Sequence, residues 1–440
     1  MNFISPFLFL ITFGYLGCAH AQSAALELPP VAVRTAGNKL EYLTPYIQRT
    51  LATNPQLLQA ESDNRVADLQ WREARAGLIP RVVLSSNLGQ DRQNLTTQNQ
   101  RYIYNQQMTQ LRLIWPLYDT SLSGQVRQRQ AASTSSDWRL TDLREQLALQ
   151  TVQTYSELVR NTRLTILAHE NLAAHRLYVA QIKAIAKADI GKASDLPSAI
   201  GRVALATSVV TSRLVKLEQT RSVWKQLTGL EAPIEVTDLK AVAAPKSLEQ
   251  VIDMAFVANP VIMLAKAEID VARQGIPLAL AAYAPKVNAE MSYKAGQDYG
   301  GIAGNRKDTY AGLAVEWTLF AGGASSLVTR EAMEKVLAAE YGFTRIQQEL
   351  RSRIEGSWHD FVGAEASLEA FREYEANARL TLEANRSQFK LGRRSLLEVL
   401  NAENELFTAR SNFESALHDI SQATWRLLSL RGQLMSEVGL

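Results

Sequence analysis

Cysteine is nearly absent from this chain: Cys18 is the only one among 440 residues. Because Cys18 lies in the N-terminal segment, the mature protein is expected to have no disulfide and no thiol chemistry, which is compatible with an oxidising compartment. An excess of charge is also absent, since 47 lysines and arginines face 44 aspartates and glutamates. Without a basic patch or aromatic residues interleaved with one, nucleic acid is excluded as a partner.

Catalytic motifs are lacking as well. The mature histidines have neither metal-ligand nor triad spacing, and His169 and His175 are six positions apart rather than the four of a helical metal pair. No nucleophile elbow or P-loop is found. The sequence therefore predicts a protein that is not an enzyme and that needs no cofactor and no metal. The four histidines are His169, His175, His359 and His418.

Long hydrophobic runs are confined to the N-terminus. The run Phe7–Leu16 precedes Ala19-His20-Ala21, a small-x-small cleavage pattern, although no Lys or Arg precedes the run. This pattern predicts a signal peptide over residues 1–21 and hence export. Two alternatives are a lipoprotein box in which Cys18 is acylated and a buried N-terminal helix. No other window offers about 20 uncharged apolar residues, so no transmembrane α-helix is predicted.

Proline and glycine are sparse outside a few positions, and those positions reveal a duplication. One stretch opens with Asn-Pro at 54–55 and ends at Pro80, and its copy opens with Asn-Pro at 259–260 and ends at Pro285. Such self-similarity indicates one structure made twice. Pairs separated by 201 positions are Gly191 with Gly392 and Trp224 with Trp425.

Each copy is typical of a helix–strand–strand–helix unit, so the predicted fold is mostly α with a small β part. A helix over residues 122–189 would be roughly 100 Å long. The predicted order is an extended leader over 22–45, a first repeat over 46–230, a linker over 231–247 and a second repeat over 248–440. Strands are predicted over 81–92, 102–116, 286–298 and 309–320, and long helices over 119–189, 195–228, 322–390 and 395–430.

The predicted strands and helices both need partners. Each strand alternates apolar and polar residues over about ten positions, which is long enough to cross a bilayer when tilted. Four strands cannot close a barrel, whereas three copies of the chain would supply 12. Helices this long must pack as coiled coils within and between protomers. The pattern favours an exported, oligomeric tube that is partly in a membrane. A soluble sheet with one wet face, in a soluble periplasmic coiled-coil scaffold or adaptor, is the alternative.

The ordered set of features resembles the TolC outer-membrane efflux protein family over about residues 40–434. The features are the duplicated Asn-Pro…Pro helix, strand pairs ending in Trp, and the segment Leu391–Ala402. The resemblance implies a homotrimer with a 12-stranded β-barrel in outer-membrane lipid, continued by a long α-helical barrel through the periplasm. It implies a passive duct for drug efflux or type I secretion. Its partners would be a periplasmic adaptor (membrane fusion protein) and an inner-membrane transporter of the resistance-nodulation-division or ABC type.

The resemblance also implies where the functional residues lie. The tips of the helical hairpins would dock the adaptor and form the entrance, although the same residues are also suited to a tight turn alone. Two acids three positions apart often follow the second tip in the family, and here Glu398 and Asn401 hold these positions. Threefold symmetry would gather three Glu398 carboxylates into a cation-favouring ring, which Asn401 weakens. The predicted tip residues are Gly191, Lys192, Ser194 and Asp195 in one half and Gly392, Arg393, Arg394 and Ser395 in the other.

Overall fold

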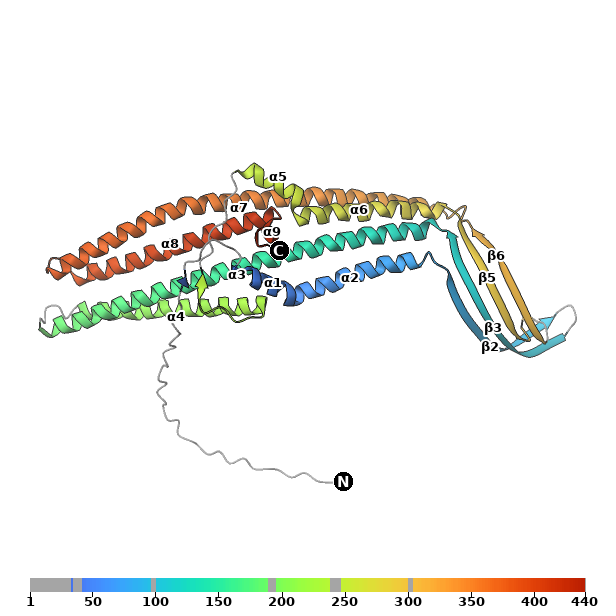
Figure 1. Cartoon of the computed structure of the whole chain (residues 1–440), viewed down its shortest axis with the longest axis horizontal. Coiled ribbons are helices and arrows are strands. Elements are labelled where there is room, and N and C mark those ends of the chain that lie inside the picture. The colour runs from blue at the N-terminus through green and yellow to red at the C-terminus, as the bar shows by residue number, and fades with distance from the viewer. Residues whose placement is uncertain are drawn as a thin grey trace, which may run out of the picture.

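A long helical body with an antiparallel sheet at one end makes up the computed structural model (Figure 1). The structure describes residues 33–34, 42–95, 100–188, 195–237, 247–299 and 304–439. The predicted signal peptide and most of the predicted leader lie outside the described residues. No single described helix is long and apolar enough to cross a membrane, whereas the bent pair formed by Leu248–Ala258 and Pro260–Tyr283 meets that test by length and composition.

The helices begin and end largely at the prolines, glycines and capping residues of the sequence. Pro55 and Pro260 each occupy the first turn of a helix, where proline lacks no needed N–H group. The predicted leader reached residue 45, but helix already begins at Thr44, because Pro45 is suited to a first turn. The helices are α1 Thr44–Thr53, α2 Pro55–Ala76, α3 Thr120–Ala188, α4 Asp195–Thr228, α5 Leu248–Ala258, α6 Pro260–Leu280, α7 Ala324–Lys390, α8 Leu396–Leu430 and α9 Leu434–Glu437, with a 3-10 turn at Ala281–Tyr283.

Four strands, two from each repeat, form one antiparallel sheet in the order β2-β3-β5-β6. The predicted strand over 309–320 is displaced: β6 begins and ends four residues earlier. The alternation continues through Trp317, but its indole nitrogen donates to the Tyr283 carbonyl at 3.0 Å instead of facing a partner strand. The strands are β2 Arg81–Leu95, β3 Gln100–Tyr118, β5 Lys286–Gln297 and β6 Asn305–Glu316.

The helices form two antiparallel pairs that extend away from the sheet, α3 with α4 and α7 with α8 (Figure 1). Next to the sheet, α2, α3, α6 and α7 lie side by side in that order. At mid-length, α4 ends close to the start of α2, and α8 ends close to the start of α6. Each repeat therefore contributes a helical hairpin, a second helix beside it and a strand pair.

The core at mid-length joins the two repeats. Trp224 and Trp425 are both fully buried in one cluster that also contains Tyr155. A small parallel pairing lies beside it, between β1 Val33–Arg34 and β4 Val236–Thr237. The sequence predicts only a leader and a linker for the segments that contain β1 and β4, so it does not predict this pairing. The Tyr155 hydroxyl fixes β4 by donating to the Thr237 carbonyl at 3.1 Å and accepting from its N–H at 2.8 Å.

Candidate functional site

The sheet presents one apolar face and one polar face. Residues directly opposite in neighbouring strands share a face, and the register places Leu84 opposite Leu111, Leu113 opposite Met291, and Ala289 opposite Leu313. Most side chains on this face are exposed, with Leu84 70% and Leu313 64% accessible, while Leu113 and Ala289 are half-buried. Exposed apolar area of this extent marks a surface that another apolar phase covers. Members of the apolar face are Val82, Leu84, Leu88, Leu111, Leu113, Trp115, Ala289, Met291, Leu313 and Val315.

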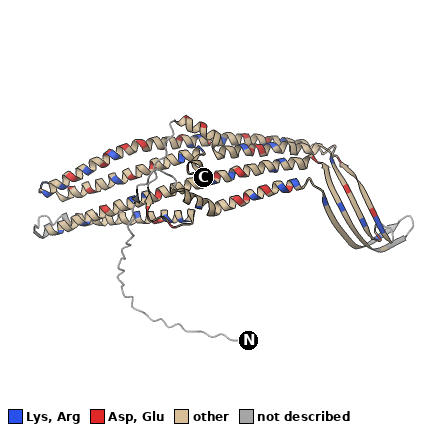
Figure 2. Ribbon diagram, viewed as in Figure 1, with Lys and Arg blue, Asp and Glu red and all other residues tan. Residues whose placement is uncertain are grey.

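The opposite face of the same strands is polar. Arg112 lies opposite Ser292, and Lys294 lies between Gln110 and Asp308. Elsewhere, charged residues of both signs are spread along the whole helical body (Figure 2). An apolar band limited to one face of the sheet is therefore a local property of this end of the molecule.

Exposed aromatic side chains gather where the sheet meets the helices. Trp115 and Tyr118 end β3, and Trp317 and Phe320 follow β6. All four are exposed, with Phe320 85% accessible. Aromatic rings at this position are typical of the boundary between hydrocarbon and water, where one part of the ring is apolar and its edge can meet polar groups.

The second hairpin tip, between α7 and α8, is a tightly hydrogen-bonded turn. Gly392 has φ of +70°, a conformation that glycine adopts without a steric penalty. The Gly392 N–H donates to the Phe389 carbonyl and the Arg393 N–H to the Gln388 carbonyl, both at 2.9 Å. These two bonds satisfy carbonyls that the end of α7 leaves open. The predicted glycine turn is thus present in the second half.

Ser395 and Glu398 cap the N-terminus of α8. The Ser395 hydroxyl accepts from the Glu398 N–H at 3.4 Å, and the Glu398 carboxylate accepts from the Ser395 N–H at 3.0 Å, which is a capping box. The same carboxylate accepts from the Arg394 guanidinium at 2.8 Å. Its bond to the Ser395 N–H, followed by that to Arg394, lowers the pKa of Glu398. Within one chain, the positive charge of Arg394 therefore offsets part of the negative charge of Glu398.

Asn401, the second predicted entrance position, contacts the other helical pair. Its side-chain oxygen accepts from Arg202 of α4 at 2.9 Å. Asn401 therefore joins the two hairpins just behind the tip. In the first half, Gly191, Lys192 and Ser194 lie outside the described residues, and Asp195 is the first residue of α4.

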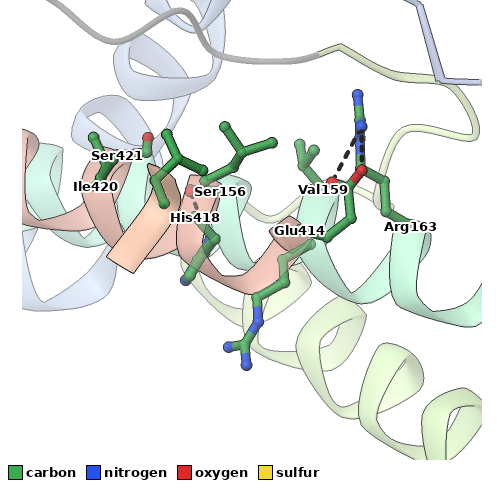
Figure 3. Close-up of a pocket in the computed structure, with 10 residues that line it drawn as sticks. Ser156, Val159, Arg163, Glu414, His418, Ile420 and Ser421 are labelled. Carbon is green, nitrogen blue, oxygen red and sulfur yellow. Dashed lines mark hydrogen bonds and ion pairs between the residues drawn. The ribbon is translucent and has the colours of Figure 1, made fainter. Parts of the chain in front are cut away.

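A row of polar contacts between α3 and α8 leads from mid-length toward the tips, and the sequence did not predict it. A cavity of about 290 Å³ lies on this row (Figure 3). His418 Nε2 donates to the Glu157 carboxylate at 2.9 Å, and its Nδ1 lies 3.0 Å from the Ser156 hydroxyl, with which it forms a hydrogen bond. Beside it, Arg163 donates to Glu414 at 2.9 Å.

The Glu157 carboxylate is the centre of this contact. His418 bonds to it, and the Arg160 guanidinium and the Asn161 amide donate to it as well. The bond to His418 comes first among the causes that lower the pKa of Glu157 to about 2. Since Glu157 and Ser156 are on α3 and His418 is on α8, the contact joins the two helical hairpins.

Nearer the tips, three helices meet at another polar contact, which is partly buried. Arg386 of α7 donates to the Tyr178 hydroxyl and to the Glu403 carboxylate, both at 2.8 Å. Tyr178 and Glu403 are buried, on α3 and α8 respectively. The Arg386 side chain itself is 45% exposed, so water partly screens the charge pair, and the contact serves to connect α3, α7 and α8.

Comparison with known proteins places these features in a known group. The model of the family described as "Outer membrane efflux protein" matches residues 46–210 and 251–433. The chain belongs to the outer membrane efflux protein family. The two matched segments fall one in each repeat, and together they contain the four strands and the greater part of the long helices.

Individual members of the outer membrane efflux protein family cover nearly the whole chain. The outer membrane efflux protein BepC of Brucella suis biovar 1 is 23% identical over 96% of this chain and 92% of its own length. The alkaline protease secretion protein AprF of Pseudomonas aeruginosa is 24% identical over 87% of this chain and 83% of its own. Among solved structures, CusC, described for transmembrane channel formation, has a TM-score of 0.78 at 18% identity, covering 92% of this chain and 95% of that one.

For this family member, sequence reasoning missed the residues that join the two hairpins. Ser156 and His418 are 262 positions apart, and Tyr178 and Arg386 are 208 apart. Each is one position of a long helix whose partner lies in a distant segment, so no local spacing distinguishes it. The only available signal was a polar residue at a position of a long helix that the periodicity assigns to the interior.

Proposed function

We propose that this protein is an outer-membrane channel-tunnel, the passive exit duct of a tripartite efflux or type I secretion system. The observation that carries this proposal is the exposed apolar face of the sheet, opposite a polar face, at one end of a long helical body. A bilayer covers such a face, while the polar face lines a water-filled lumen. The duct has no catalytic activity. A soluble scaffold or adaptor would leave this apolar face in water, and that alternative is disfavoured.

Three copies of the chain form the channel. The sheet order makes β2 and β6 the two edges within the described residues, and open edges are not tolerated in hydrocarbon. Pairing β2 of one copy with β6 of the next closes a barrel, and three copies supply 12 strands, an even number of the kind such barrels use. The helices at the corresponding edges, α2 and α7, support the same contact because both expose large apolar side chains. These are Leu58, Val66 and Leu69 on α2 and Leu327, Leu337 and Tyr341 on α7.

The opposite end meets the partners. A periplasmic adaptor binds the hairpin tips, Gly191, Lys192, Ser194 and Asp195 in one half and Gly392, Arg393, Arg394 and Ser395 in the other, and an inner-membrane transporter of the resistance-nodulation-division or ABC type supplies the cargo. The relatives' names support both systems, since BepC is named for efflux and AprF for protease secretion. Glu398 and Asn401 of three copies line the entrance. The Arg394 contact weakens the proposed cation-favouring ring, because it offsets part of each Glu398 charge.

A matched pair of substitutions on β2 tests the membrane assignment. Leu84→Arg places a charge on the apolar face, where it costs about 2–4 kcal/mol at mid-bilayer depth. Asn87→Arg places the same charge on the polar face of the same strand, where little change is expected. The measurement is membrane fractionation combined with the gel mobility of unheated and heated samples. We expect the wild type and Asn87→Arg to be membrane-bound and heat-modifiable, and Leu84→Arg to lose both properties.

Two outcomes would contradict the proposal. One is a wild-type protein found in the soluble periplasm that migrates as a monomer without heating. The other is equal membrane yield of Leu84→Arg and Asn87→Arg, which would show that lipid does not contact the apolar face. For the entrance, Glu398→Gln is expected to reduce cation selectivity in planar-bilayer recordings, and unchanged selectivity would remove Glu398 from the constriction.

A further inference from the structure

A cavity of about 330 Å³ lies at mid-length, where α8 ends beside the start of α6. Residues of α3, α6, α7 and α8 form its wall, and we call it the junction cavity. Asn259 of this wall fixes the joint, because its side-chain amide donates to the Leu430 carbonyl at 2.7 Å. The volume is within the range of small-molecule sites, and four helices hold the wall in place. The junction cavity is separate from the sheet and from the hairpin tips.

The charged side chains in the wall of the junction cavity are mainly acidic. Asp142 and Glu145 come from α3 and Glu349 from α7, against a single base, Arg353 of α7. The residues that α6 and α8 contribute carry no charge. The C-terminal end of α8 adds partial negative charge at the same place, and the N-terminal end of α6 adds partial positive charge, so the two helix ends offset one another. Arg345, also on α7, pairs with Glu349 at 2.6 Å and Arg353 approaches it at 4.0 Å, so the two α3 acids dominate the remaining charge.

Glu145 is the acid of this wall whose hydrogen bonding is incomplete. It is 6% exposed, and its Oε1 accepts only a long bond, 3.5 Å, from the Met435 N–H. Its Oε2 has no hydrogen-bond partner within the described part of the chain. A buried acceptor left without a partner destabilises the folded protein. Burial raises the pKa of Glu145 to about 7, so the carboxyl changes charge near neutral pH. A donor with positive charge in the cavity would relieve both costs.

The remaining wall decides which kind of cation fits. Among the described residues, no group of three or more His, Cys, Asp or Glu side chains could hold a metal ion. The wall instead adds apolar side chains, Leu149 of α3 and Ile346 and Leu350 of α7. One buried acid beside an apolar surface matches a molecule with an ammonium group at one end and a hydrocarbon body at the other.

We propose that the junction cavity binds small amphiphilic amines, with the ammonium group on Glu145 and the apolar body against Leu149, Ile346 and Leu350. The site goes beyond the duct function, because it lies in the protein wall at mid-length and needs neither adaptor nor transporter. The bound amine would also link α3 to α7 and to the joint between α8 and α6.

Isothermal titration calorimetry of the purified full-length protein tests the proposal. The probe is 2-phenylethylamine, and 2-phenylethanol is its uncharged counterpart of the same shape. We expect the amine to bind and the alcohol not to bind. Because the amine stays protonated while Glu145 with a pKa of about 7 loses its proton, affinity should rise about tenfold from pH 6 to pH 8. Asp142, Glu349 and Arg353 also face the cavity, so the profile is compared in variants.

Glu145→Gln is expected to abolish amine binding and its pH dependence. Glu355→Gln is the matched control, since Glu355 is on α7, pairs with Arg351 at 2.9 Å and does not line the cavity. Leu149→Trp fills the cavity, keeps Glu145 and should also abolish binding. Equal binding of amine and alcohol, or undiminished amine binding in Glu145→Gln or in Leu149→Trp, would overturn the proposal. None of these outcomes depends on membrane assembly, so this site and the duct function fail independently.

Discussion

The two Asn-Pro joints of the molecule are built alike and closed differently. Asn54 and Asn259 both cap the helix that follows, each accepting from an N–H two positions on at 2.9 Å. Within the described part of the chain, only Asn259 also donates, to the carbonyl of Leu430 at the end of α8. The second joint is therefore bound to the helix that ends beside it, whereas the side chain of Asn54 serves its own helix. The helix cap is common to both joints, and the bond from Asn259 to Leu430 makes the second joint the firmer connection.

A glycine follows the helix that ends at each joint, and these glycines show the same difference. Gly229 follows α4 with φ of +70°, and a Cβ there would lie 3.8 Å from the Thr53 hydroxyl. Gly432 lies beyond the end of α8 with φ of +68°, and a Cβ there would lie 2.7 Å from the Ala258 carbonyl oxygen. Both positions need a left-handed backbone, but only the second is also closed to a side chain.

Substitution of these glycines is expected to have the largest effect. Gly229→Ala should cost about 1–2 kcal/mol of unfolding free energy, the penalty of a left-handed conformation alone. Gly432→Ala adds overpacking against the backbone, about 1–3 kcal/mol more. Urea unfolding of both variants measures the difference. Equal losses of unfolding free energy would mean that a Cβ at Gly432 does not clash with the Ala258 carbonyl oxygen.

Removal of the two caps is the next test. Asn54→Ala should cost about 1 kcal/mol, the loss of one helix cap. Asn259→Ala should cost about 2–4 kcal/mol, because it also leaves the Leu430 carbonyl without its partner. Hydrogen exchange at the end of α8 should rise in Asn259→Ala and stay unchanged in Asn54→Ala. A similar rise in both variants would contradict the link between Asn259 and α8.

The two repeat-related tryptophans give a smaller difference. Both are fully buried, but the Trp425 indole donates to the Ser421 hydroxyl at 3.0 Å, while the Trp224 indole has no partner among the described residues. Replacement by Phe removes similar volume at both sites. Trp425→Phe loses a hydrogen bond, whereas Trp224→Phe removes a buried donor that had no partner within the described part of the chain. Trp425→Phe should therefore be less stable than Trp224→Phe by about 2 kcal/mol in thermal unfolding. The reverse order would point to a partner for Trp224 in the assembled protein.

The tip glycine provides the smallest and most local effect. Gly392 has φ of +70° with open space around it, so Gly392→Ala should cost about 1 kcal/mol without a clash. Gly356, in the middle of α7 and also in open space, is the control, since Gly356→Ala should stabilise the helix by up to about 1 kcal/mol. Melting temperatures of the two variants should move in opposite directions. A shift in the same direction would contradict the turn geometry.

Periodicity and proline placement made the main elements predictable. The alternation over β5 and the capping residues at Ser395 follow local rules that a single sequence displays. The end of β6 was misplaced because the alternation continues through Trp317 although the strand pairing ends at Glu316. Contacts between distant segments were beyond local rules. The pairing of Val33 with Val236 and the bond between Ser156 and His418 depend on how the two repeats pack.

The uncapped edges of the sheet set a condition on how the protein is made. Within the described residues, a newly exported copy has two unpaired strand edges, on β2 and β6, next to the exposed apolar face of the sheet. Such a copy can stick to any extended chain that it meets in transit. Under the proposed closure of three copies, these edges become paired, so the separate copy is the state most prone to association through its strand edges.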